Sequence, residues 1–224
     1  MLYIVSTPIG NLKDITFRAV ETLRNADLIA AEDTRHTKIL LDHYKITTPT
    51  TSFFEHNQIK KGDFLLSKLK EGQKIALVTD AGTPGISDPG FHLIRLAQEN
   101  NIPITVVPGA TALIAALSLS GLPAHAFVFE GFLPVKSAAR RKKLSEFKSE
   151  TRTIIFYESP HRLLKTLKDI EEVLNNLTVA VARELTKKFE ELQKAPARKL
   201  IEHFSRTKPR GEFVLLLNLI DKKT

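Results

Sequence analysis

The chain has 224 residues, of which 42% are hydrophobic and 26% charged, and this balance excludes a disordered, collagen-like or fibrous protein. It contains no cysteine, which excludes disulfides, thiolate metal sites and cysteine nucleophiles and fits a cytoplasmic protein. No apolar run approaches the roughly 18 residues of a membrane span, and no basic segment followed by an apolar core opens the chain, so we expect a soluble protein without a membrane helix or signal peptide.

Strand and helix patterns alternate through the first half of the chain. Short runs rich in Val, Ile, Leu and Thr predict strands, and apolar residues recur at helical spacing between them. Strict alternation predicts parallel strands covered by helices. The predicted strands are residues 2–7, 28–32, 50–54, 74–79 and 104–107.

The second half predicts a separate, more mixed α/β unit. An alanine-rich apolar helix at 112–119 ends at Gly121 and Pro123, where we place a domain boundary. The fold class is therefore α/β with two α/β domains, residues 1–120 and 121–224. The second domain has predicted strands at 127–132, 153–157, 178–182 and 213–218 and predicted helices at 141–147, 162–174 and 197–204.

The net charge of +8 comes entirely from the second half. Residues 1–118 hold 12 basic and 12 acidic side chains, whereas residues 119–224 hold 21 and 13. The basic residues concentrate at 136–152 and 198–210. Such runs form either solvated helix faces or a surface for a polyanion such as nucleic acid.

Three loops after strands of the first half are candidate walls of a ligand site. Ligands of open parallel sheets bind at the carboxyl ends of the strands. The loop at 6–12 carries Gly10 but is not the G-x-G-x-x-G dinucleotide motif. The loop at 79–90 has three glycines, two prolines and two aspartates, which predicts a rigid loop that presents main-chain groups to a ligand. At 106–112 a strand turns sharply into the small-residue helix, which leaves the Thr111 hydroxyl and the helix amides for a ligand.

Further polar residues follow strands at 32–35, 158–161 and 183–184. The seven histidines form no H-x-x-x-H or H-x-H pair and no cysteine accompanies them, so no metal site is predicted.

Six segments together resemble a bacterial enzyme family, the ribosomal RNA small-subunit methyltransferase I family of the tetrapyrrole-methylase-like superfamily. The resemblance runs in order from residue 2 to about residue 217. The segments are VSTPIGNLKDIT (5–16), AEDTRHTKILL (31–41), VTDAGTPGISDPG (78–90), VVPGATALIAALSLSGLP (106–123), FYESPHRL (156–163) and VARELTKKFEE (181–191).

The resemblance implies an S-adenosylmethionine-dependent 2′-O-methylation of a cytidine ribose in the decoding centre of 16S rRNA. It also implies two α/β domains with the cofactor in the cleft between them, and a homodimer. The substrate is either the naked rRNA or the assembled small ribosomal subunit.

The resemblance also assigns residues to the cofactor site. The superfamily's Gly-Asp-Pro loop falls on Gly82-Thr83-Pro84, so a Thr stands where an Asp is usual. The implied cofactor contacts are Pro8, Ala81, Gly82, Thr83, Pro84, Ser87, Asp88, Thr111, Ala112, Tyr157 and Ala182.

Methyl transfer to a ribose hydroxyl is an in-line displacement that needs positioning and a proton acceptor but no metal. We hypothesise that Asp14, Glu32 or Asp33 accepts the proton and that Arg35 or Arg183 holds the neighbouring phosphate. Each could equally be a capping or salt-bridged surface group. The candidate RNA-binding residues are Arg140, Arg141, Lys142, Lys143, Arg183 and Arg210.

Two other functions are consistent with the same residues. A tetrapyrrole C-methyltransferase would use the same cofactor loop, with a few arginines binding the substrate's carboxylates. A non-catalytic RNA-binding module on a methylase fold would keep the basic half but would not bind S-adenosylmethionine.

Overall fold

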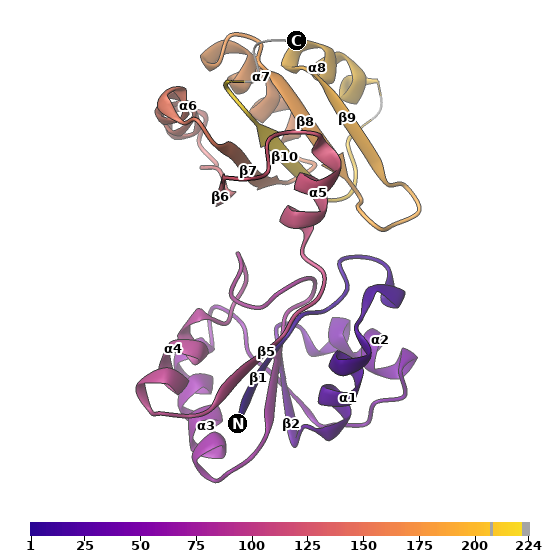
Figure 1. The fold of residues 1–224 in the computed structure, drawn as a ribbon, viewed down its shortest axis with the longest axis vertical. Coiled ribbons are helices and arrows are strands. Elements are labelled where there is room, and N and C mark those ends of the chain that lie inside the picture. The colour runs from indigo at the N-terminus through magenta and orange to yellow at the C-terminus, as the bar shows by residue number, and fades with distance from the viewer. Residues whose placement is uncertain (207, 221–224) are drawn as a thin grey trace. The chain divides into compact units, whose positions relative to one another are not determined.

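The structure, a computed structural model, describes residues 1–206 and 208–220 and divides into two compact units, Met1–Thr111 and Ala112–Thr224 (Figure 1). Each unit is a β-sheet covered by helices, which confirms the predicted class of two α/β domains. The sequence places the boundary after residue 120, whereas the structure groups α5 (Ala112–Ser120) with the second unit. The reason is that this uncharged helix packs against the strands of the second sheet.

The first unit contains a five-stranded parallel sheet in the order β3-β2-β4-β1-β5. All five strands lie where the sequence predicts them, although several end one or two residues earlier. The strands are β1 (Leu2–Val5), β2 (Leu28–Ala31), β3 (Thr50–Ser52), β4 (Ile75–Val78) and β5 (Ile104–Val107).

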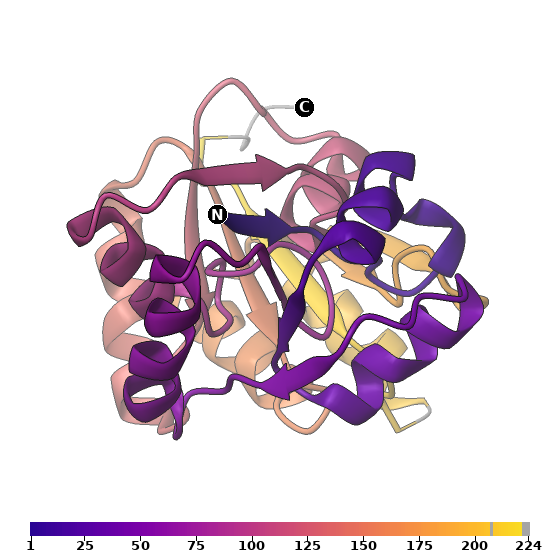
Figure 2. The same ribbon diagram turned by 90° about the horizontal axis from the view of Figure 1, so that it is seen from below.

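Helices cover both faces of this sheet, as Figures 1 and 2 show. Side chains alternate along a strand, so in β4 Ala76 and Val78 pack with α1 and α2, while Ile75 and Leu77 pack with α3 and α4. This explains why the inner strands β2 and β4 are apolar throughout. The helices are α1 (Phe17–Asn25), α2 (Thr34–His43), α3 (Gln58–Lys70) and α4 (Phe91–Glu99), preceded by a 3₁₀ helix at Leu12–Asp14.

The neighbouring strands β1 and β4 send their connections to opposite faces of the sheet. The chain leaves β1 through α1 on one face, and it leaves β4 through α4 on the other. Such a switch point opens a crevice at the carboxyl ends of the two strands, where open α/β sheets bind ligands.

The second unit contains a mixed sheet in the order β6-β7-β10-β8-β9. β6 runs parallel to β7, and the other neighbouring pairs are antiparallel. One face packs against α6, α7 and α8, and α5 also packs on this sheet. The elements are β6 (Phe127–Phe132), α6 (Ser137–Glu146), a 3₁₀ helix (Phe147–Ser149), β7 (Thr153–Glu158), α7 (Leu163–Val173), β8 (Thr178–Arg183), β9 (Glu191–Pro196), α8 (Ala197–Ser205) and β10 (Phe213–Leu217).

Within the described part of the chain, none of the helices combines the length and the apolar character that crossing a membrane requires.

Candidate functional site

Four loops at the carboxyl ends of the first-unit strands form what we call the first-unit rim: residues 6–16, 32–35, 79–90 and 108–111. They follow β1, β2, β4 and β5. Because these strands are parallel neighbours, their loops leave the sheet at the same edge. The rim therefore contains the switch point between β1 and β4.

The loops after β1 and β4 are joined by a two-residue bridge. The Thr7 N–H donates to the Gly82 carbonyl at 2.8 Å, and the Gly82 N–H donates to the Thr7 carbonyl at 3.1 Å. The Thr7 hydroxyl also donates to the Thr79 carbonyl at 3.1 Å. Gly82 has a φ of +87°, a conformation that residues with a Cβ rarely adopt. The bridge fixes the glycine-rich loop at the switch point.

The loop after β5 packs onto the same bridge. The Ser6 and Thr83 hydroxyl oxygens lie 2.8 Å apart, and the Thr83 hydroxyl donates to the Ala110 carbonyl at 3.5 Å. A Cβ on Gly109 would lie 3.0 Å from the Ser6 Cβ, so a side chain here would require Ser6 to move by a few tenths of an ångström. Thr83 therefore hydrogen bonds to the loops after β1 and β5.

Carboxylates gather where β2 and β4 end. Glu32 Oε2 accepts a hydrogen bond from the Thr79 hydroxyl at 2.5 Å and from the Asp80 N–H at 3.2 Å. The Asp33 N–H donates to Asp80 Oδ1 at 3.1 Å. These bonds hold three acidic side chains next to one another and tie the ends of the two strands together.

The rim shifts its carboxyl pKa values in both directions. Burial, together with the negative charges of Glu32 and Asp80, raises the pKa of Asp88 to about 6, although a hydrogen bond from Thr79 opposes the shift. Burial also raises the pKa of Asp80. By contrast, hydrogen bonds from Arg35 lower the pKa of Asp33 to about 2. With a pKa of about 6, Asp88 can exchange a proton close to neutral pH.

The structure brings three of the four predicted catalytic residues together. Glu32 and Asp33 are adjacent on the rim, and Arg35 Nη2 lies 2.8 Å from Asp33 Oδ2. Asp33 also caps α2 by accepting the Arg35 N–H. Asp14 lies elsewhere on the rim, exposed at the end of the first 3₁₀ helix, where its N–H donates to the Asn11 carbonyl.

The predicted first-unit cofactor contacts all fall on the rim or directly after it. Pro8, Gly82 and Pro84 are buried and shape the loops, whereas Ser87 is exposed with a φ of +69°. Rim residues of this set are Pro8, Ala81, Gly82, Thr83, Pro84, Ser87, Asp88 and Thr111, and Ala112 follows as the first residue of α5.

In the second unit, Tyr157 and Ala182 lie in one row of the sheet. Both are register partners of Val214, on either side of it. The Tyr157 ring is half-buried and stands edge-on to Phe129 and Phe132, with ring centroids 5.0 and 5.7 Å away. The structure therefore places these two predicted cofactor contacts near each other, on strands β7 and β8.

The structure corrects the prediction that Arg140 binds RNA. Its side chain is only 2% exposed, with Nη2 2.6 Å from an Asp169 carboxylate oxygen and Nε donating to the same oxygen at 2.7 Å. Nη1 donates to the Val135 carbonyl at 3.0 Å. Arg140 therefore joins α6 to α7 inside the unit, because a buried guanidinium must be paired.

The other predicted RNA-binding residues remain at the surface in two groups. On α6, Arg141 is exposed beside Glu172 at 2.5 Å, Lys142 is exposed, and Lys143 lies 2.9 Å from Glu130. At the end of β8, the Arg183 Nε donates to the carbonyl of the exposed Arg210 at 2.8 Å.

We did not predict from the sequence that Thr79 and Asp80 hydrogen bond to Glu32 and Asp33. The sequence shows that Thr79 and Asp80 directly follow a strand, but that this strand neighbours the one before Glu32 is known only from the sheet. The buried Glu158, singled out after a predicted strand, has a structural role instead. It accepts from the Thr166 hydroxyl at 2.5 Å and pairs with Arg162 at 3.0 Å, which fixes the start of α7.

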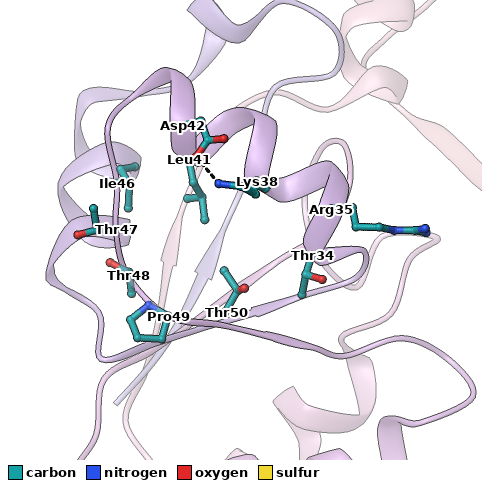
Figure 3. A pocket seen from close by; sticks show the side chains of 10 residues that line it. All are labelled: Thr34, Arg35, Lys38, Leu41, Asp42, Ile46, Thr47, Thr48, Pro49 and Thr50. Carbon is teal, nitrogen blue, oxygen red and sulfur yellow. Dashed lines mark hydrogen bonds and ion pairs between the residues drawn. The ribbon is translucent and has the colours of Figure 1, made fainter.

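An open pocket of about 440 Å³ lies along α2, beside the chain that leads into β3 (Figure 3). Arg35 extends away from the other lining side chains, and Lys38 pairs with Asp42 at 2.7 Å. Threonines contribute much of the lining. Its residues are Thr34, Arg35, Lys38, Leu41, Asp42, Ile46, Thr47, Thr48, Pro49 and Thr50.

Across residues 1–206 and 208–220, no three His, Asp or Glu side chains are grouped so that they could hold a metal ion.

Comparison with known proteins identifies the family. The model of the Tetrapyrrole (Corrin/Porphyrin) Methylases matches residues 1–201. Ribosomal RNA small subunit methyltransferase I from Synechocystis is 54% identical over 97% of this chain and 78% of its own. The protein of that name from Thermotoga maritima is 48% identical over 97% of both chains.

Solved structures share the fold at low sequence identity. The crystal structure of the methyltransferase CobJ has a TM-score of 0.73 and 18% identity, covering all of this chain and 96% of that one. Uroporphyrin-III C-methyl transferase from Thermus thermophilus complexed with S-adenyl homocysteine has a TM-score of 0.66 at 18% identity, covering 98% of each chain. The chain belongs to the ribosomal RNA small subunit methyltransferase I family, within the tetrapyrrole methylases.

Proposed function

We propose that this protein transfers the methyl group of S-adenosylmethionine to the ribose 2′-oxygen of a cytidine in the decoding centre of 16S rRNA. The observation that carries the proposal is the 48–54% identity to ribosomal RNA small subunit methyltransferases I over nearly the whole chain. The rim at the β1–β4 switch point and the excess positive charge of the second half support it.

The rim fits the chemistry of the donor. S-adenosylmethionine supplies a methyl group on a sulfonium, so that the sulfur leaves as a neutral thioether once the methyl is transferred. The bridge to Thr7 fixes the Gly82 loop at the switch point, and the carboxylates of Glu32, Asp80 and Asp88 suit hydroxyl and ammonium donors. Tyr157 and Ala182 remain proposed donor contacts in the second unit.

A rim carboxylate would accept the proton of the ribose hydroxyl. Asp14, Glu32 and Asp33 remain the proposed bases, with Arg35 or Arg183 next to the phosphate. Such a base contributes about 10²- to 10⁴-fold. Replacing each acid with Ala and measuring single-turnover transfer tests the set, and a loss below about tenfold in every variant would remove the proposal.

The basic residues of the second unit would hold the RNA through its phosphates. Phosphate contacts fix position and register, and their strength falls with salt. The proposed contacts are Arg141, Lys142, Lys143, Arg183 and Arg210. We further propose a cytoplasmic homodimer that acts on rRNA or on the assembled small subunit.

Salt titration separates this proposal from a tetrapyrrole substrate. Transfer to RNA is expected to weaken steeply between about 50 and 200 mM salt, while the affinity for S-adenosylmethionine changes little. If neither methyl transfer to RNA nor the affinity for S-adenosylmethionine weakens with salt, RNA is not the substrate.

A further inference from the structure

Residues 184–190 connect β8 to β9 (Figure 1), and Phe189 lies near the end of this connection. We call this connection the β8–β9 loop. Phe189 is 64% exposed, although a phenylalanine ring is normally buried. This segment belongs to one of the motifs that carry the family resemblance, yet none of the functions assigned above uses it.

Bonds within the loop and to Glu212 hold the residues on both sides of Phe189. Lys187 Nζ lies 3.0 Å from Glu184 Oε1 and 2.9 Å from Glu212 Oε2. The Thr186 N–H donates to Glu190 Oε2 at 2.6 Å, and the Glu190 N–H donates to the Lys187 carbonyl at 3.1 Å. These bonds span the residues on both sides of Phe189.

One cation lies at the ring. Lys188 Nζ is 5.6 Å from the Phe189 ring centroid, within the range of a cation–π contact, and Lys188 is exposed. Further basic residues lie on the chain segment that Lys187 contacts. Glu212, which pairs with Lys187, lies two residues from the exposed Arg210, and Arg183 at the end of β8 donates to the Arg210 carbonyl at 2.8 Å.

We propose that Phe189 is a stacking platform for an unpaired base of the RNA substrate, with Lys188 contacting the adjacent phosphate. This inference rests on the proposed function and adds a base contact to its phosphate contacts. Proteins that bind single-stranded RNA combine exposed aromatic rings with cations in this way, since every base offers a π-face and every linkage a negative charge.

The absence of tryptophan from the sequence allows a direct test. Phe189→Trp introduces a single tryptophan, whose fluorescence should be quenched when the full chain binds a single-stranded RNA oligonucleotide that spans the target cytidine. Phe64→Trp is the matched control, because Phe64 on α3 is also partly exposed with Lys61 Nζ 5.1 Å from its ring centroid. Its fluorescence should not change. Absence of quenching at Phe189→Trp with saturating RNA would overturn the inference.

Affinity measurements separate stacking from apolar burial. Phe189→Ala should weaken RNA binding by about 10- to 100-fold, Phe189→Leu nearly as much, and Phe189→Trp should not weaken it. Lys188→Ala should instead reduce the salt dependence of RNA binding, by the amount expected for the loss of about one phosphate contact. Donor affinity and oligomeric state should stay at wild-type values in all three Phe189 variants. RNA affinity within twofold of wild type in Phe189→Ala, or an altered oligomeric state, would overturn the stacking role.

The proposed function fails separately. If the wild-type protein neither binds nor methylates small-subunit RNA, the enzyme assignment itself is wrong. If the wild type methylates RNA while the Phe189 variants match it, only the stacking inference is wrong.

Discussion

Gly72 and Gly82 have nearly the same backbone φ, +89° and +87°, but only Gly82 lies in the first-unit rim. Gly72 ends α3, with open space around the position of a Cβ, and Gly82 lies in the bridge to Thr7. A Cβ at Gly82 would meet only ordinary contacts, at 3.7 and 3.8 Å. Substitution at either position therefore acts through the backbone and not through a clash.

We predict that Gly72→Ala and Gly82→Ala each lower the free energy of unfolding by about 1 to 2 kcal/mol, the cost of a left-handed residue with a side chain. Only Gly82→Ala should also weaken binding of S-adenosylmethionine, because only that loop belongs to the rim. Urea denaturation and calorimetric titration measure the two effects. Equal donor affinities in both variants would contradict the assignment of this loop to the donor.

The contribution of Asp88 to the free energy of unfolding should fall as pH rises. Its pKa is raised from 3.8 to about 6 in the folded protein, so the fold holds this proton more tightly than the unfolded chain does. The protonated form is therefore favoured in the fold, and stability is lost between about pH 4 and pH 6. Asp88→Asn removes the charge and should be about 1 to 2 kcal/mol more stable than wild type at pH 7, after allowance for partial exposure, and equal to it at pH 4.

Asp33 should have the opposite effect, so that its contribution to the free energy of unfolding is lost as pH falls. Its pKa is lowered to about 2, so its carboxylate stabilises the fold above its usual pKa of 3.8 and loses this contribution as pH falls toward 2. Asp33→Asn keeps a residue that can cap α2 and should be less stable than wild type at neutral pH. The difference should shrink in acid. Thermal unfolding from pH 2.5 to 7 compares both variants, and parallel pH profiles would contradict the two pKa shifts.

Arg140 and Arg141 are neighbours in sequence with different predicted roles. Arg140→Ala leaves the buried Asp169 unpaired and should cost about 3 to 5 kcal/mol of stability. Arg141→Ala removes an exposed pair and should cost less than about 1 kcal/mol, while reducing the salt dependence of RNA binding.

A double variant keeps the Arg140 prediction testable if the single one fails to fold. Arg140→Met with Asp169→Leu replaces the pair by apolar groups and should recover most of the stability while binding RNA like wild type. Loss of RNA affinity in the folded double variant would return Arg140 to the RNA-binding set.

Much of the fold could be predicted from the sequence, because strands and helices have residue patterns that can be recognised within one short segment. The strands β1, β2 and β4 have the apolar character of strands covered on both faces. The strand β9 was missed because Glu191–Pro196 carries Lys, Ala and Pro, which are poor strand formers. It becomes a strand only through its pairing with β8. The start of α6 was predicted at residue 141 and lies at Ser137, within a polar segment without helical periodicity.

The sequence predicts which loops form the site, but it does not predict which of their side chains hydrogen bond to one another. Position after a strand is enough to place Glu32 and the residues 79–90 on one rim. Which of these groups bond to each other depends on strand order, which the sequence leaves open. The burial of Arg140 depends on Asp169, 29 residues later on another helix, and a basic run gives no sign of such a partner.

Mapping the transferred methyl group tests most directly whether the protein methylates a ribose of 16S rRNA. Small ribosomal subunits from cells that lack the enzyme would be incubated with the purified protein and S-adenosylmethionine labelled in its methyl group. We expect label at a single cytidine of the 16S rRNA, with the phosphodiester bond that follows it resistant to alkali, because a methylated 2′-oxygen can no longer attack the phosphate. Label on a base, or a labelled nucleotide whose linkage alkali still cleaves, would contradict the proposed 2′-O-methylation.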